Sequence, residues 1–116
     1  MENNEENEIK IEEKDVEVNV EGVYVHKLKK PFTWEGVTYT EFTLDLDGLK
    51  GSDLEAVEDE MDMEKKFAMI PEYSISYIMK LAARAAKVHS SVMENLPIRD
   101  ANIIKNITKN FLLRKE

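Results

Sequence analysis

The sequence contains no cysteine, so disulfides, thiolate metal sites and thiol nucleophiles are excluded. Its longest apolar run is the four residues 67–70, far short of the roughly 20 that a membrane-spanning helix needs. Its four glycines are spread over positions 22 to 51, so no phosphate-binding loop is present. The first six residues are acidic where a secretory signal is basic and then apolar, so we expect the chain to be made and kept in the cytosol.

The negative charge is concentrated at one end of the chain. Of the net charge of −8, residues 1–21 contribute nine acids and two lysines, which is −7, and leave −1 for residues 22–116. The nearly neutral body has no cluster of Lys and Arg with interleaved aromatic residues. We therefore expect no nucleic-acid partner.

A chain of 116 residues that is 42% hydrophobic fits one folded domain. Residues 1–8 lack aliphatic side chains after Met1, and valines alternate with polar residues at 16, 18 and 20. The alternation predicts a strand over 15–21. We expect residues 1–22 to form a partly mobile acidic extension, and residues 23–116 to form a single domain.

Two β-rich stretches follow, residues 23–28 and 37–44, with Trp34-Glu35-Gly36 between them. Glycine allows the positive φ that a tight turn needs, so the pair predicts a β-hairpin. Trp34 is interpreted as a cap on the core, with a role in partner contact as the alternative. His26, in the first strand, is expected to be a surface residue.

Helical signals fill the rest of the chain. Ser52–Glu55 resembles a capping box and predicts a helix from about Asp53 that ends by Pro71. A second helix is expected over 74–88, opened by Glu72 or Ser74, with an apolar arc wide enough to make it the centre of the core. Ser91–Glu94 resembles another capping box and is expected to open a short turn that Pro97 closes, and residues 98–113 predict the last helix. The fold class is therefore α+β, an N-terminal hairpin or small antiparallel sheet followed by three to four helices.

The sequence contains few residues in patterns that suit catalysis or metal binding. His26, in the first strand, and His89, at a helix end, are expected to be surface or capping residues and not catalytic ones. Residues 43–48 imitate the start of a calcium loop, but the twelfth position is Leu54 where a glutamate is required. Acids at 58–64 read as a solvated helix face. We expect a non-enzymatic interaction protein with no cofactor and no metal.

Methionines are numerous for a small domain, with five between residues 61 and 93. Met fills irregular gaps in cores and also adapts to varied apolar ligands. Core filling is the simpler interpretation, and an adaptable binding groove is the alternative.

The order of these features resembles the tail assembly chaperone family of long-tailed bacteriophages. The resemblance covers roughly residues 27–113 and rests on four segments, none of them catalytic: the hairpin 31–44, the helix start 51–55, the helix centre 77–83, and Leu96-Pro97-Ile98-Arg99-Asp100 before a helix that ends in Phe111-Leu112. The acidic first 22 residues are not required by the family pattern.

The resemblance implies a protein of the infected host's cytoplasm that is absent from the finished virion. Members of this family coat the tape measure protein until tail tube subunits polymerise around it, and a frameshifted longer product often accompanies the short one. A tape measure presents long apolar stripes that aggregate unless covered, which fits a binding partner with a wide apolar arc.

The last helix carries an apolar arc of about 180°, wider than one neighbour requires. We expect the partner-binding surface to draw on this arc and on two nearby tyrosines: Tyr73, Tyr77, Ile103, Ile107, Phe111 and Leu112. Such an arc is also compatible with homo-oligomers. Two alternatives remain open: an acidic inhibitor or nucleic-acid mimic that binds a host protein, and a minor structural component of the tail.

Overall fold

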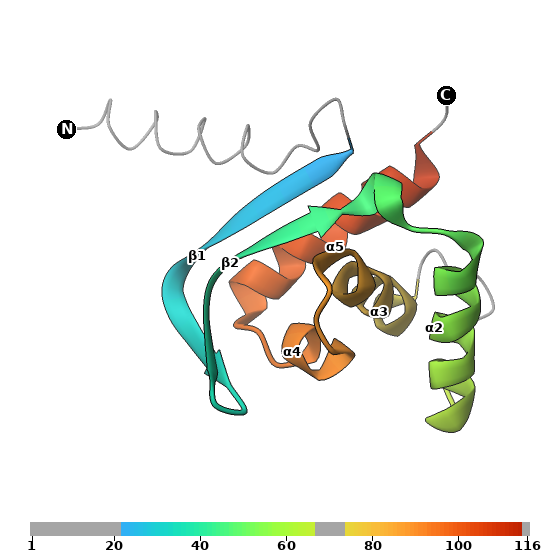
Figure 1. Cartoon of the computed structure of the whole chain (residues 1–116), viewed down its shortest axis with the longest axis horizontal. Helices are drawn as coiled ribbons and strands as arrows, with labels where there is room; N and C mark the ends of the chain where they lie inside the picture. The colour runs from blue at the N-terminus through green and yellow to red at the C-terminus, as the bar shows by residue number, and fades with distance from the viewer. Residues whose placement is uncertain (1–21, 67–73, 115–116) are drawn as a thin grey trace.

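The structure, a computed structural model, describes residues 22–66 and 74–114. The elements follow in the order β1 (Val23–Trp34), β2 (Val37–Asp45), the 3₁₀ turn η1 (Leu46–Gly48), α2 (Gly51–Met63), α3 (Ile75–Ala86), α4 (Ser90–Glu94) and α5 (Ile98–Leu113). The hairpin lies on one side of the helices and α2 on the other, with α3 between them (Figure 1). The expected α+β fold is confirmed, whereas the strand predicted at 15–21 and the acidic extension before residue 22 lie outside the described residues.

The two strands form an antiparallel hairpin whose register runs from Val23 opposite Asp45 to Trp34 opposite Val37. An irregularity between Lys27 and Phe32 interrupts the register on β1. The expected turn is confirmed, and both of its central residues have positive φ, 51° at Glu35 and 84° at Gly36. Two-residue turns of this kind match the twist of the flanking strands.

The start of α2 differs from the sequence prediction. The helix begins at Gly51, and Oδ2 of Asp53 accepts a hydrogen bond of 2.7 Å from the backbone N–H of Lys50. The capping box predicted over Ser52–Glu55 is therefore wrong, because the acid that reaches back to the helix start is Asp53. An aspartate at the third helical position satisfies a backbone donor that the helix itself leaves without an acceptor.

Helix α3 occupies the centre of the fold, as predicted. Ser74 caps it, its Oγ accepting a hydrogen bond of 3.3 Å from the N–H of Tyr77. The helix contacts α2, α4, α5 and β2, and eight of its twelve residues are buried. It ends at Ala86 because Lys87 adopts the left-handed conformation, with φ 60°.

Helix α4 is capped by His89, whose Nδ1 accepts a hydrogen bond of 3.1 Å from the N–H of Ser91. The capping role expected for His89 is confirmed, and the capping box predicted at Ser91–Glu94 is wrong because the imidazole already supplies the acceptor. The bounds predicted for the last helix are confirmed by α5.

The buried side chains of residues 22–66 and 74–114 form two hydrophobic clusters. The main cluster joins the inner face of the hairpin to α3, α4 and α5, and the smaller one joins α2 to α3 through Val57, Met61, Tyr77 and Leu81. Trp34 packs against the main cluster, and its indole N–H donates a 3.3 Å hydrogen bond to Oγ of Ser91, as its interpretation as a cap predicts.

Candidate functional site: a groove between α3 and α5

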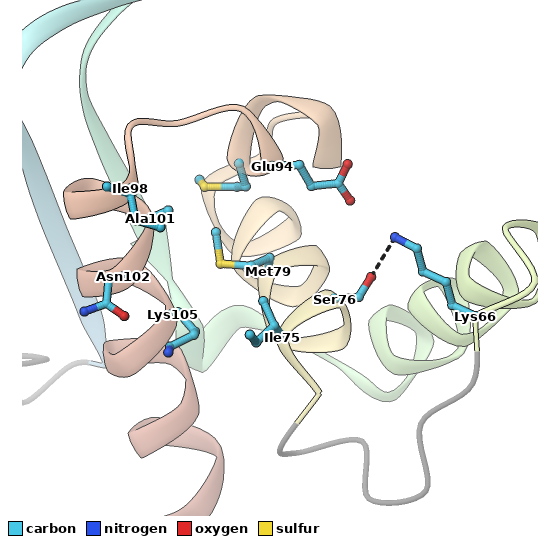
Figure 2. Close-up of a pocket in the computed structure, with 10 residues that line it drawn as sticks. Lys66, Ile75, Ser76, Met79, Glu94, Ile98, Ala101, Asn102 and Lys105 are labelled. Carbon is cyan, nitrogen blue, oxygen red and sulfur yellow. Dashed lines mark hydrogen bonds between the residues drawn. The ribbon is translucent and has the colours of Figure 1, made fainter.

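An open groove of about 590 Å³ lies between the N-terminal halves of α3 and α5 (Figure 2). Two isoleucines stand at its mouth. Ile75, the first residue of α3, is 63% exposed, and Ile98, the first residue of α5, is 84% exposed. Large apolar side chains at this exposure leave an uncovered apolar surface on both walls of one groove.

The floor of the groove is built from side chains that are also part of the main core. Met79 from α3 and Met93 from α4 line the groove and are buried. Ala101 from α5 also lines it, and its small side chain leaves the groove open. Both interpretations of the methionines therefore have structural support, since the same two residues fill the core and face the groove. Flexible thioether side chains let such a floor adapt to what lies on it.

Some polar groups on the rim are already paired with other described residues, and the cation on α5 is not. Nζ of Lys66 lies 3.1 Å from Oγ of Ser76 (Figure 2). It also lies 3.1 Å from Oε1 of Glu64. Glu94 accepts a 3.0 Å hydrogen bond from Lys80. Lys105 has no ion pair among the residues that the structure describes. The rim cation on α5 is therefore available to a partner.

Beside the groove, the buried Lys80 holds three helices together. Its side chain is 1% exposed, and Nζ donates to Glu60 at 3.2 Å, Glu64 at 3.1 Å and Glu94 at 3.0 Å. Ser90 adds a 2.5 Å hydrogen bond from its Oγ to Glu60. We call these five residues the Lys80 cluster; it joins α2, the residue after it, α3 and α4.

The charges of this cluster are mutually stabilised. Burial opposes the charge on Lys80, but the hydrogen bonds to the three glutamates outweigh burial and raise its pKa. Burial likewise opposes ionisation of Glu60, while the hydrogen bonds from Ser90 and Lys80 hold its pKa below the usual value. Hydrogen bonds from Lys66 and Lys80 lower the pKa of Glu64. The acids at 58–64 are thus only in part the solvated face expected from the sequence.

A second pair ties α2 to α3. Nε of Arg84 donates a 2.6 Å hydrogen bond to Oδ1 of Asp53. This bond, together with the one from the backbone N–H of Lys50, lowers the pKa of Asp53. Lys80 and Arg84, one turn apart on α3, therefore both contact acidic residues of α2.

His26 departs from its expected surface position. It is buried between Tyr24 and Asp100, in a chain of hydrogen bonds that joins β1 to α5. The expectation was wrong because a period-2 pattern places His26 on the same inner face as Tyr24, where α5 supplies a carboxylate partner. The three polar groups are satisfied by one another and are enclosed, as in a structural network.

The six residues predicted to bind a partner lie in different environments. Tyr77 is buried in the smaller cluster and Ile107 in the main one, while Tyr73 lies outside the described residues. The other three are partly buried: Ile103 and Phe111 pack against the main cluster and Leu112 against the smaller one. The structure therefore does not gather them into one exposed patch, and their role in binding stays a prediction.

The isoleucines at the groove mouth were not singled out by sequence reasoning. Ile75 was counted within the broad apolar arc of α3, and Ile98 only as the start of a helix. Nothing in their spacing marked them, because the exposure of a residue in the first turn of a helix depends on which elements pack beside it. Among residues 22–66 and 74–114, no group of three His, Cys, Asp or Glu side chains is placed to hold a metal, and no described helix is long and apolar enough to cross a membrane.

Comparison with known families identifies one to which the chain belongs. The model of the family described as "Phage tail assembly chaperone proteins, E, or 41 or 14" matches residues 25–113, and the chain belongs to this family. Searches of curated proteins and of solved structures gave no match.

Proposed function

We propose that the protein binds the tape measure protein in the host cytoplasm, covers its apolar stripes until tail tube subunits polymerise, and is then released from the assembling tail. Family membership supplies the setting of tail assembly. The observation that carries the proposal is the open groove whose mouth exposes Ile75 and Ile98. A folded protein that leaves apolar side chains on both walls of one groove has a surface ready to cover those of another chain.

Helix α5 also enters the proposed partner surface through the residues expected from the sequence. Its partly buried members, Ile103, Phe111 and Leu112, are the ones that a partner can reach without opening the core. We further propose contact with tail tube subunits and with a frameshifted longer form of the chain, in keeping with a family whose members act in tail assembly.

The test is co-expression of the tape measure protein of the same phage with and without this chain. We expect the tape measure to be soluble and to co-purify with the chain when both are present, and to precipitate when it is alone. Mass spectrometry of finished particles is expected to detect the tape measure and not the chaperone. Recovery of the chain inside particles would favour a structural tail component, and recovery of a host DNA-binding protein instead of the tape measure would favour an inhibitor.

A further inference from the structure

We infer that the groove between α3 and α5 binds an amphipathic helix of the tape measure protein, with an apolar ridge flanked by acidic side chains. The inference rests on the proposed function and specifies the surface and the chemistry of the partner segment. The alternative occupants are the acidic residues 1–21 of this chain and a second copy of it.

The walls of the groove have the spacing of helix packing. Ile75 and Met79 lie one turn apart on α3, and Ile98, Ala101 and Lys105 lie at i, i+3 and i+7 on α5. Figure 2 shows these two rows facing one another across the groove, and Met93 of α4 also belongs to its lining. Two rows of this spacing leave a channel into which the ridge of a third helix packs.

The charge around the groove determines which charged side chains a partner helix can carry on either side of its apolar ridge. Lys105 stands on the α5 wall without an ion pair in the described part of the chain, whereas Glu94 on the opposite rim is already bound by Lys80. The one acid of α5, Asp100, is buried against His26, so the charge that this helix exposes is positive. Acidic side chains beside an apolar ridge are therefore attracted to the α5 wall, and basic ones are repelled.

The full-length chain offers substitutions that change the groove without disturbing the fold. Ile75→Glu and Ile98→Glu replace exposed side chains in the first turn of a helix, where a carboxylate is favoured by the helix dipole. Leu54→Glu is the matched control, because Leu54 is 42% exposed near the start of α2 and does not line the groove. Lys105→Glu tests the charge, and Arg99→Glu on the same helix, outside the groove lining, is its control.

The probes are 25-residue peptides that tile the tape measure protein, measured by fluorescence anisotropy, and the full-length tape measure in co-purification. We expect one or a few acidic amphipathic peptides to bind, Ile75→Glu and Ile98→Glu to weaken binding at least about tenfold, and Lys105→Glu to weaken it to a similar degree. The two control variants are expected to bind as the unaltered chain does, and circular dichroism is expected to give the same melting temperature for all five variants.

The outcomes separate the inference from the proposed function. If the tape measure co-purifies with the unaltered chain and equally with Ile75→Glu and Ile98→Glu, the groove assignment is overturned and the function stands. If the tape measure does not co-purify at all, the function fails and the inference with it. Displacement of the bound peptide by a synthetic peptide of residues 1–21 would identify that segment as the occupant. A loss of dimer mass in Ile98→Glu by sedimentation, with no peptide bound, would identify a second copy.

Discussion

His26 on β1 and Asp100 on α5 are 74 residues apart in the chain and lie in hydrogen-bond contact, with 2.7 Å between Nε2 and Oδ1. The hydroxyl of Tyr24 lies 2.8 Å from Nδ1 of the same ring. When Nε2 carries the proton, it donates to Asp100, and Nδ1 accepts from Tyr24, so both ring nitrogens are satisfied. This arrangement fixes the hairpin against the helix that forms one wall of the groove.

Asp100→Ala is expected to lower the free energy of unfolding by about 1–3 kcal/mol, because it leaves the N–H of His26 buried without an acceptor. Urea denaturation followed by circular dichroism measures the change. Arg99→Ala, at the exposed neighbouring position, is the control and is expected to change stability by no more than about 0.5 kcal/mol. An unchanged urea midpoint for Asp100→Ala would contradict the structural role assigned to this pair.

Lys80→Met is expected to destabilise the fold by about 2–4 kcal/mol, because three glutamates then face one another without their shared cation. Arg84→Met removes a cation from the same helix, but the Arg84 side chain is 44% exposed, so the expected loss is at most about 1 kcal/mol. Thermal melts of both variants test the difference. Equal losses would show that burial of the Lys80 cluster adds nothing to its strength.

Acid is expected to destabilise the protein through the carboxylates of α2 and the residue after it. The pKa values of Asp53, Glu60 and Glu64 are lowered in the folded chain, so the unfolded chain binds more protons in acid. Their contribution is complete above the ordinary glutamate pKa of about 4.5 and falls as the pH drops through the folded values. Urea midpoints at pH 3 to 7 should decline below about pH 5, and Lys80→Met should flatten that decline.

The hairpin turn provides a test of backbone conformation free of side-chain contacts. Gly36 has φ 84°, and a Cβ placed there meets nothing within 4 Å. Gly36→Ala is therefore expected to cost about 1 kcal/mol through the left-handed backbone alone. Glu35, with φ 51°, should gain a few tenths of a kcal/mol from replacement by Asn, which tolerates this conformation better. Gly36→Ala is therefore expected to lower the melting temperature, and Glu35→Asn to raise it.

Ile103→Glu and Ile98→Glu, on the same helix, distinguish core from contact surface. Ile103 packs against the main cluster, so a glutamate there is expected to lower the melting temperature by several degrees, whereas Ile98→Glu leaves it unchanged. Both are expected to weaken tape measure binding. If Ile103→Glu weakens binding while the melting temperature stays constant, the part of α5 predicted from the sequence is a contact surface and not core.

Much of the fold was predictable because its signals are local. The hairpin turn at Glu35-Gly36, the cap at Ser74 and the bounds of α5 each follow from chemistry within a few residues. The two predicted capping boxes are wrong for a related reason. In each helix a side chain one or two residues away, Asp53 in one and His89 in the other, accepts the backbone hydrogen bond instead.

The site was less predictable because it depends on which elements meet. Lys80 belongs to a polar stripe at helical spacing, and only the placement of α2 and α4 turns that stripe inward. His26 is buried because α5 returns to the inner face of the hairpin. The groove likewise depends on tertiary structure. The first turns of α3 and α5 are distant in the sequence but lie side by side, and they leave Ile75 and Ile98 uncovered.

Among the described residues, helix α2 is attached to the rest of the molecule by one small apolar cluster, the Lys80 cluster and the Arg84–Asp53 pair. Because two of these three attachments involve carboxylates whose pKa is lowered in the folded chain, we expect α2 to open at a lower free energy than the hairpin and α5. Once the pH falls through the lowered pKa values of these carboxylates, we expect the helix to detach while the part of the groove built on the main cluster keeps its shape. We therefore expect two levels of cooperativity, with the proposed partner surface in the more resistant one.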